Sequence, residues 1–332
     1  MSPGNTEGGE AVRSPAKEPP LLKLSLTNIG SIREAAIELL RGFTALYGAN
    51  GSGKTAVARA LRLLAKLNNA QAKGIDILEL INKEKKEGTI VYEGGGAKQM
   101  LECKLDKAGA QLSFNKESFS VFADDRLDVL IENPAITLAW VSGDSVKLFG
   151  VGAARREGPY KLGDLLRPSV FRSFVLGAND VAELYEQMLT DVNEMLEDVT
   201  DYRIEYRDGV YFKRGLHVFK PDLASAGVLR LALIFTAVRL TEAMADIAGK
   251  TIPVVFIENL EAPLFADYLS SLVDILHGRT AAIVGETHSG LVLRAAVMKA
   301  NYYVFVDGTV AKNLKPEYFW REVQVWSSLG AP

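Results

Sequence analysis

The feature that most constrains the fold of this chain is the segment 48–55, Gly-Ala-Asn-Gly-Ser-Gly-Lys-Thr, which fits the pattern G-x-x-x-x-G-K-[ST]. The apolar run from Phe43 to Tyr47 predicts a buried strand before it, and apolar residues recur at helical spacing from Lys54 to Leu67 after it. A glycine-rich loop between a strand and a helix turns successive backbone N–H groups toward an anion at the helix N-terminus. The segment therefore predicts a nucleotide-binding loop in an α/β fold.

The residues of this loop have distinct expected roles. Lys54 is expected to reach the β- and γ-phosphates of ATP, and the hydroxyl of Thr55 to ligate Mg²⁺. The remaining residues are expected to form the phosphate cradle, and they are Gly48, Asn50, Gly51, Ser52 and Gly53.

A second apolar run, Val254 to Ile257, predicts a strand that ends at Glu258. A P-loop needs a further carboxylate near its metal, at the end of a neighbouring strand, so we expect Glu258 to complete the Mg²⁺ site with Thr55. Glu261 is the nearest further carboxylate, and it either polarises the attacking water or is an acid that suits the dipole of a helix beginning near Pro263. Both interpretations stay open on the sequence.

A third apolar run, 281–284, leads into the polar cluster Glu286-Thr287-His288-Ser289. The carboxyl ends of parallel strands converge on the ligand crevice of an α/β fold. We therefore expect His288 to hydrogen-bond the γ-phosphate or the attacking water.

The pattern of elements predicts how the chain is organised. Short runs with period-two character between Gly88 and Val141 predict an antiparallel sheet lobe, and residues 180–199 predict an amphipathic helix. A hairpin-like stretch, 202–219, precedes a helix opened by Ser225 that is apolar almost all round and hence buried. The last third alternates strands and helices as far as Val306, which is typical of parallel strands with crossover helices.

We accordingly expect one domain from residue 21 to residue 332, preceded by a disordered tail, 1–20, that is rich in Gly, Pro, Ser and Glu. Its regions are expected to be a β-rich P-loop lobe (about 21–150), a helical and basic insertion (about 151–201) and a C-terminal lobe (about 202–332).

Composition excludes several classes of protein. Apolar residues make up 48% and charged residues 24% of the chain, which is ordinary for a folded globular protein. No stretch of eighteen apolar residues occurs, so we expect no transmembrane helix and no membrane partner. The single cysteine, Cys103, allows neither an internal disulfide framework nor a multi-cysteine zinc site, and it fits a reducing, cytoplasmic location.

At this point the residues resemble a known family, the ATPase heads of the ABC superclass in the branch of RecF, SMC and OLD-like proteins. The resemblance rests on four segments and covers about residues 21–68 and 220–307; the segments are 22–30, 48–55, 257–261 and 286–289. It implies a P-loop NTPase of ABC-ATPase head type, with a mixed sheet core, an antiparallel β lobe and a helical insertion. In that branch a Ser-x-Gly signature opens a buried helix and donates to the γ-phosphate of ATP held by a partner head. Ser225 and Gly227 match this signature, so the resemblance implies a homodimer with Mg-ATP sandwiched between two heads.

The chain departs from this family in two ways. Relatives usually carry an acidic pair whose second carboxylate is the catalytic base, whereas this chain has Glu258-Asn259. An amide cannot accept a proton, so either Glu261 or His288 activates the water, or turnover is slow and the ATP-bound dimer is long-lived. No glutamine of the Q-loop kind follows the run 136–141, where the sequence continues as Ser-Gly-Asp. We also expect neither a long coiled coil nor a nuclease domain.

The role beyond ATP stays open on the sequence. The leading hypothesis is DNA maintenance, repair or chromosome organisation. The alternatives are an ATPase subunit that regulates a separate nuclease in a defence or toxin system, and so has an additional protein partner, or a slow nucleotide-gated scaffold. Residues 155–172 hold five bases and two acids, which suits a phosphate track for DNA, although a solvated basic loop is the commoner explanation. The formal charge of −3 gives no general attraction to nucleic acid.

Overall fold

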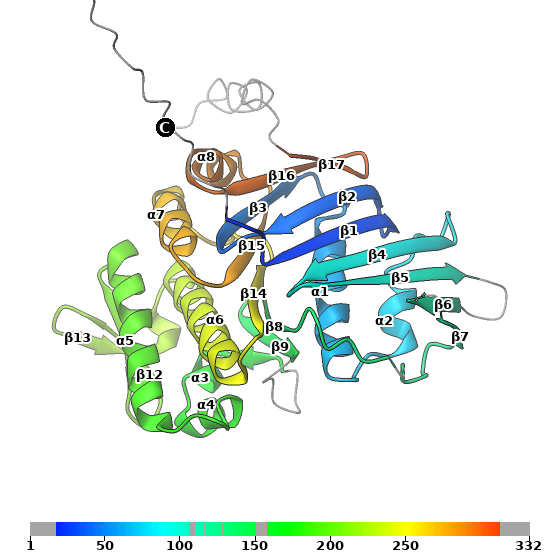
Figure 1. Ribbon diagram of the computed structural model, residues 1–332. Coiled ribbons are helices and arrows are strands. Elements are labelled where there is room, and N and C mark those ends of the chain that lie inside the picture. Colours follow the sequence, from blue (N-terminus) through cyan, green and yellow to red (C-terminus); the bar gives the residue numbers. More distant parts are fainter. Residues whose placement is uncertain (1–17, 106–109, 116, 128, 151–157, 313–332) are drawn as a thin grey trace, which may run out of the picture.

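Five parallel strands form the centre of the structure, a computed structural model that describes residues 18–105, 110–115, 117–127, 129–150 and 158–312. In spatial order they are β8 (Ile136–Ser142), β14 (Ile252–Ile257), β15 (Ala282–Thr287), β3 (Gly42–Gly48) and β16 (Asn301–Val306) (Figure 1). Because these strands run the same way, their C-terminal residues all lie at one edge, which we call the C-terminal edge.

The same sheet continues on both sides to a total of fourteen strands. Beyond β8 lie β9 (Ser145–Gly150) and β10 (Tyr160–Lys161). Beyond β16 come β17 (Thr309–Lys312), β2 (Ile32–Leu39), β1 (Leu22–Ile29), β4 (Glu87–Gly94), β5 (Ala97–Leu105), β6 (Ala110–Phe114) and β7 (Glu117–Val121). From β2 to β7 every pairing is antiparallel, and these strands form the predicted β lobe.

The prediction is wrong for one strand of that lobe. The run Ile136–Val141 is β8, which pairs in parallel with β14 in the centre of the sheet. Its first four residues are all buried, as expected of a central strand that is covered on both faces, whereas a strand with one solvated face would alternate.

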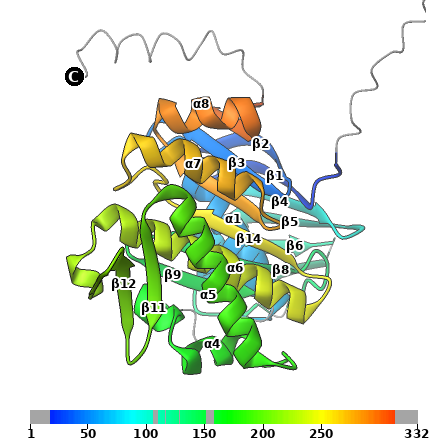
Figure 2. The ribbon, with the colours of Figure 1, turned by 90° about the vertical axis from the view of Figure 1, so that its left-hand side faces the viewer.

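Helices cover both faces of the central strands. On one face lie α6 (Ala226–Ala248), α7 (Ala266–His277) and α8 (Gly290–Lys299), and α5 (Val181–Val199) packs outside α6 (Figure 2). The other face carries α1 (Lys54–Asn68), with the short α2 (Gly74–Leu78) beside it. None of the helices in the described ranges is long and apolar enough to cross a membrane.

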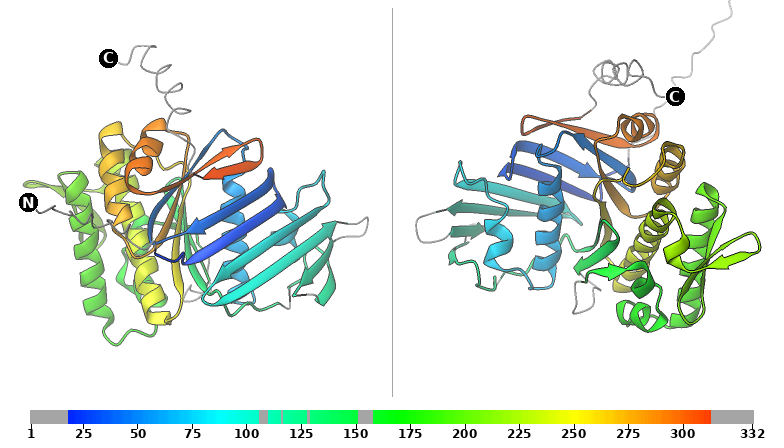
Figure 3. Two further views of the ribbon diagram at one scale, coloured as in Figure 1. Left: turned by 45° about the horizontal axis from the view of Figure 1, so that its top comes forward. Right: turned by 180° about the vertical axis from the view of Figure 1, so that it is seen from behind.

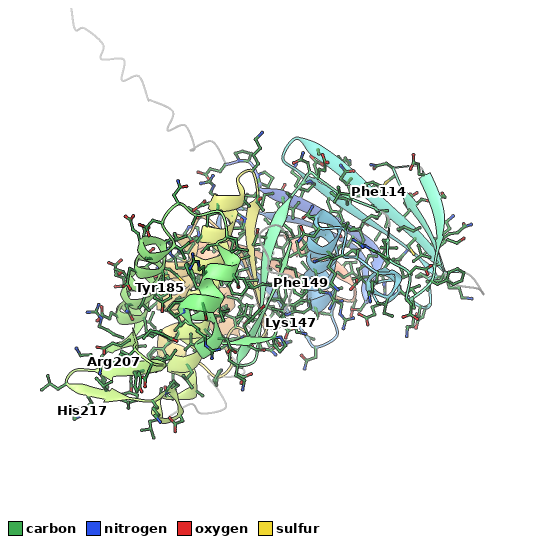
Figure 4. The ribbon with its side chains drawn as sticks, turned by 90° about the horizontal axis from the view of Figure 1, so that it is seen from below. Phe114, Lys147, Phe149, Tyr185, Arg207 and His217 are labelled. Carbon is green, nitrogen blue, oxygen red and sulfur yellow. The ribbon has the colours of Figure 1, made fainter. Side chains whose placement is uncertain are left out.

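Two smaller groups of elements remain, one of short helices and one a second, separate sheet. The helices α3 (Leu162–Leu165) and α4 (Pro168–Phe174) follow β10, and the 3-10 helix η1 (Pro221–Leu223) precedes α6. A separate three-stranded sheet is formed by β11 (Tyr202–Tyr206), β12 (Val210–Arg214) and β13 (His217–Phe219). Seen from below, His217 of this small sheet and Phe114 of the β lobe lie at opposite ends of the molecule, with Phe149 of β9 between them (Figure 4).

Alternation along the central strands creates two hydrophobic cores. In β14, Val255 and Ile257 join the core beneath α6, while Val254 and Phe256 join the core around α1. The second core also includes the β lobe, so the sheet curves around α1 and encloses it (Figure 3). The hydroxyl of Tyr92 in β4 confirms this contact, since it donates to the carbonyl oxygen of Ala60 in α1 at 2.7 Å. The N-terminus of α1 is thereby held at the C-terminal edge.

A buried ion cluster ties α6 to the segment before β15. Glu242 is only 2% exposed, and its Oε2 accepts hydrogen bonds from Arg239 at 2.6 Å and Arg279 at 2.5 Å. Its Oε1 accepts from the backbone N–H and the hydroxyl of Thr280, at 3.0 and 2.9 Å. Burial disfavours the charged form of Glu242, but the guanidinium groups of Arg279 and Arg239 outweigh burial and lower the pKa of this carboxyl.

Replacing Glu242 should be strongly destabilising, because it leaves the partly buried guanidinium group of Arg279 without its anion and removes one of the two carboxylates paired with Arg239, the other being Asp191. We expect Glu242→Ala to lower the free energy of unfolding by about 3–5 kcal/mol at neutral pH, measured by urea denaturation. Asp274→Ala, which removes an exposed ion pair with Lys299, is the control and should cost less than about 1 kcal/mol.

The effect should also depend on pH. A depressed carboxyl pKa stabilises the fold above the unfolded-state value of about 4.3, and this contribution is lost as the pH falls through the folded-state value. The difference between wild type and Glu242→Ala should therefore shrink below about pH 4. A difference that stays constant through acidification would contradict this assignment.

Candidate nucleotide-binding site

The loop 48–53 joins β3 to α1 in a conformation that requires its glycines. Gly48, Gly51 and Gly53 have φ values of 156°, 75° and 114°. A Cβ atom on Gly53 would lie 2.5 Å from a side-chain carbon of Ile32, and one on Gly48 would lie 2.7 Å from the carbonyl oxygen of Phe305. These two positions are therefore closed to larger residues on steric as well as conformational grounds.

The N-terminus of α1 is left open to an anion. Its N-cap is Gly53, which makes no side-chain cap, and its first turn holds no acidic residue. By contrast, Asp180 and Ser225 cap α5 and α6 with their side-chain oxygens. The first N–H groups of α1 thus lack a side-chain acceptor within the described structure, which is the arrangement expected of a phosphate-binding helix.

Lys54 is buried against the loop that precedes it. The residue is 2% exposed, and its Nζ donates to the carbonyl oxygens of Gly48 at 2.7 Å and Ala49 at 2.9 Å. Nζ also lies 3.9 Å from Oε1 of Glu286. Burial lowers the pKa of Lys54, and the nearby carboxylates of Glu286 and Glu261 oppose this shift.

Glu286 is a site residue to which the sequence analysis gave no role. It lies in β15, is 8% exposed, and its Oε2 accepts a hydrogen bond from the hydroxyl of Thr55 at 3.4 Å. Burial raises the pKa of Glu286, Lys54 opposes that shift, and the carboxylate of Glu258 adds to it. The available signal was an acid in the polar cluster that follows the apolar run 281–284, at the end of a predicted parallel strand.

Glu258 lies at the C-terminal edge but not against Thr55. Its Oε2 accepts a hydrogen bond from the hydroxyl of Ser142, which ends β8. Its backbone carbonyl accepts a hydrogen bond from Arg230 of α6 at 2.7 Å. Within the part of the chain that the structure describes, the carboxylate bonded to the Thr55 hydroxyl is that of Glu286.

Asn259 lies in a backbone conformation that its short polar side chain tolerates. Its φ is 44°, in the left-handed region, where Asn is tolerated better than most residues with a side chain. The next residue, Leu260, donates its N–H to the carbonyl oxygen of Glu286 at 2.8 Å, so this turn is tied to β15. The Asn259 side chain itself is exposed.

Glu261 reaches the same edge from the turn after β14. Its Oε1 accepts the backbone N–H of His288 at 2.8 Å, and its Oε2 is buried without a hydrogen-bond partner among the described residues. The interpretation of Glu261 as the N-terminal acid of a helix is wrong, because α7 begins only at Ala266. His288 is half-buried, and its ring is near enough to Glu286 to oppose the raised pKa of that carboxyl.

Ser225 and Gly227 begin α6, as predicted, at some distance from the loop. The Ser225 Oγ accepts the N–H of Val228 at 3.3 Å and so caps the helix. No hydrogen bond or ion pair joins Ser225 to residues 48–55 in the described part of one chain. A cavity of about 810 Å³ lies between the first turns of α6 and the end of β14, with Arg230 and Glu258 in its lining.

The basic segment 155–172 is only partly visible, since Arg155 and Arg156 lie outside the described residues. Of its remaining bases, Lys161 pairs with Asp144 at 3.2 Å and Arg167 lies 3.8 Å from Asp164. The positive excess of the described portion is therefore partly neutralised by neighbouring carboxylates.

These residues fit Mg-ATP. The described residues hold no cluster of three His, Cys, Asp or Glu side chains able to bind a metal without help. Mg²⁺ does not require one, because it usually binds through one or two carboxylates together with substrate phosphates and water. The uncapped N-terminus of α1, the Thr55 hydroxyl and the unpartnered Oε2 of Glu261 are the groups that such a ligand would satisfy.

Comparison with known proteins agrees with this geometry. A family described as an AAA domain matches residues 23–126, which include the loop 48–55. No curated protein matches the sequence.

Three solved structures are similar along most of the chain. An Smc head bound to the C-terminal winged-helix domain of ScpA has 16% identity and a TM-score of 0.57, covering 91% of this chain and 100% of that one. An Smc head from Pyrococcus furiosus with an extended coiled coil, bound to the C-terminal domain of ScpA, has 14% identity and a TM-score of 0.51, covering 92% and 98%. The recombination mediator RecF, with a nucleotide, has 12% identity and a TM-score of 0.50, covering 89% and 99%. The chain therefore has the fold of the ABC-type ATPase heads of the SMC and RecF branch.

Proposed function

We propose that this chain binds Mg-ATP at the loop 48–55, hydrolyses it slowly, and dimerises around it. The observation that carries the proposal is the convergence of Lys54, Thr55, Glu261 and Glu286 beside the uncapped N-terminus of α1. An ammonium, a hydroxyl and carboxylates around open helix N–H groups form a set suited to a metal-bound triphosphate.

The residues of the edge have separate tasks in this mechanism. Lys54 exchanges the carbonyl oxygens of Gly48 and Ala49 for phosphate oxygens, and Thr55 offers its hydroxyl to Mg²⁺. The bound metal supplies charge neutralisation on the phosphates. Glu261, held through one oxygen by the N–H of His288, turns the other oxygen toward the attacking water and accepts its hydrogen bond.

A second copy completes the site. The hydroxyl of Ser225 accepts the Val228 N–H but keeps its own proton, which it donates to the γ-phosphate held by the partner. Two exposed apolar residues flank this helix start, Leu223 at 73% and Phe265 at 65% exposure. The segment of Phe265 lies beside α6, since a Cβ on Gly227 would be 3.5 Å from the carbonyl oxygen of Pro263. Apolar surface around a polar donor favours burial against a partner.

The wider role that we propose is DNA maintenance, repair or chromosome organisation. It is supported by the similarity to Smc heads and to the recombination mediator RecF. Asn259 favours slow turnover, because the amide that suits the left-handed backbone leaves the usual second carboxylate absent. An ATP-bound dimer with a long lifetime would serve as a nucleotide-gated scaffold as well as an enzyme.

Lys54 should be essential for nucleotide binding. We expect Lys54→Ala to weaken binding of a non-hydrolysable ATP analogue by about 100-fold, measured by calorimetry, because the phosphates lose their buried counter-charge. Lys147→Ala, at an exposed position of β9, is the control and should bind as wild type does. Undiminished affinity in Lys54→Ala would exclude this loop as the nucleotide site.

Ser225 should matter for dimerisation but not for binding. We expect Ser225→Asp to keep the helix cap, because Asp caps as well as Ser, and to place a negative charge against the partner's γ-phosphate. In light scattering with a non-hydrolysable analogue, wild type should become dimeric and Ser225→Asp should stay monomeric while still binding nucleotide. Ser120→Asp, exposed in β7, is the matched control. A monomeric wild type at high protein and nucleotide concentration would contradict the shared site.

Glu261 should act on the chemical step. We expect Glu261→Gln to slow single-turnover hydrolysis by at least about 100-fold, since general acid–base groups contribute that much or more, while the affinity for ATP is retained. Asp267→Asn, in the first turn of α7, is the control. Hydrolysis at the wild-type rate in Glu261→Gln would remove Glu261 from this role and leave His288 to be tested by His288→Ala.

A further inference from the structure

The C-terminal edge holds more carboxylates than cations beside Thr55 and Lys54. Glu286 and Glu261 both act electrostatically on the buried ammonium of Lys54, and Glu258 acts on Glu286. Glu258 is also the electrostatic counterpart of the Arg230 guanidinium. Two carboxylates beside one ammonium leave an excess of negative charge in a partly desolvated setting. An anionic ligand without a metal would therefore be repelled by Glu286 and Glu261.

Glu286 occupies the most restricted position of the three. It is buried, whereas Glu258 and Glu261 are half-buried. Its backbone is fixed on both sides, because it is paired with Leu46 of β3 and its carbonyl oxygen accepts the N–H of Leu260. Its carboxylate contacts both functional side chains at the start of α1, Thr55 at 3.4 Å and Lys54 at 3.9 Å. It cannot leave the edge without disturbing the central sheet.

We propose that Glu286 is the carboxylate that receives the divalent cation beside Thr55, and that it makes binding of ATP conditional on that cation. This inference rests on the proposed function and adds to it the residue that sets the metal requirement. Without the cation, Glu286 lies against Lys54 and Thr55 and repels the phosphates. A bound cation would neutralise the charge of Glu286 and attract the phosphates, which Lys54 would then contact.

Two observations favour Glu286 over Glu258 for this task. Glu258 is directed to the end of β8, where the Ser142 hydroxyl bonds its Oε2, whereas Glu286 accepts the hydrogen bond of the hydroxyl that is expected to ligate the metal. Glu286 also belongs to β15, the direct neighbour of β3, while Glu258 follows β14, one strand further away. With Glu286 as its ligand, the cation has a carboxylate that does not depend on residue 259. Having Asn259 there in place of an acid then costs the site less negative charge.

The test compares ATP binding with and without metal in the full chain. Calorimetric dissociation constants for a non-hydrolysable ATP analogue are measured in MgCl₂ and in EDTA, and their ratio is the metal dependence. Glu286→Gln keeps the size of the side chain and an acceptor for Thr55 but removes the charge. We expect it to reduce this ratio at least about tenfold, chiefly through tighter binding in EDTA.

Three further variants make the result specific. Glu102→Gln, exposed in β5, controls for the loss of one negative charge and should leave the ratio unchanged. Glu258→Gln should reduce the ratio less than Glu286→Gln does. Glu286→Asp keeps the charge but shortens its reach, so the metal requirement should persist while the Mg²⁺ concentration for half-maximal binding rises. Thermal unfolding establishes whether each variant is folded. If Glu286→Gln does not fold, Glu286→Asp is the variant that tests the proposal.

The outcomes separate this inference from the proposed function. A wild type that binds no nucleotide with or without Mg²⁺ would refute nucleotide binding itself. A wild type that binds Mg-ATP, together with an unchanged ratio in Glu286→Gln or an unchanged Mg²⁺ concentration for half-maximal binding in Glu286→Asp, would overturn the role of Glu286 alone. A larger loss of metal dependence in Glu258→Gln than in Glu286→Gln would assign the cation to Glu258.

Discussion

The parallel register of β14, β15 and β3 is the constraint on which the rest of the structure depends. It brings together side chains that are more than two hundred residues apart, because the residues at the C-terminal ends of neighbouring parallel strands share one edge. Thr55 and Glu286 meet across 231 positions in this way. The register holds because apolar residues fill both faces of the strands, beneath α6 on one side and around α1 on the other. A slip of one residue in β15 would turn Glu286 into a hydrophobic core.

The charged groups at this edge are not fully paired within the described structure, which is the arrangement expected of a ligand site. Lys54 is buried, and Glu261 has a buried oxygen without a hydrogen-bond partner in the described structure. Glu242 is also a buried acid, but arginine, backbone and hydroxyl donors bond both of its oxygens, and its pKa is lowered. The pKa of Glu286 is raised instead, because burial and Glu258 together outweigh the opposing effects of Lys54, His288 and Thr55. This contrast between two buried carboxylates supports the proposal that Glu286 binds a cation.

Sequence patterns predicted those parts of the fold whose signals are local. The glycine-rich loop, the helix after it, and the buried helix opened by Ser225 lie where they were expected, because spacing and turn residues act over a few positions. The run Ile136–Val141 was assigned to the wrong part of the sheet, since a short apolar strand does not reveal its neighbours. The contact of Glu286 with Thr55 was missed for the same reason. Only the order of β14, β15 and β3 decides which acid reaches the hydroxyl, and that order is a property of the folded sheet.

The link between α6 and the C-terminal edge follows from one buried arginine. Arg230 is 4% exposed and donates to the backbone carbonyl oxygens of Glu258 and Gly143, which belong to the ends of β14 and of β8. Burial lowers the pKa of Arg230 to about 10, so it stays charged at neutral pH, with Glu258 as its electrostatic counterpart. Arg230 lies little more than one turn after Ser225, so the helix start and the Glu258 turn are joined through a single side chain. A partner that contacted Ser225 would therefore contact the same short stretch of helix from which Arg230 holds the backbone carbonyl of Glu258. The buried cluster at Glu242 ties the C-terminal half of α6 to the segment before β15. The helix is therefore joined to the central sheet in both of its halves, through Arg230 near its start and through Glu242 near its end.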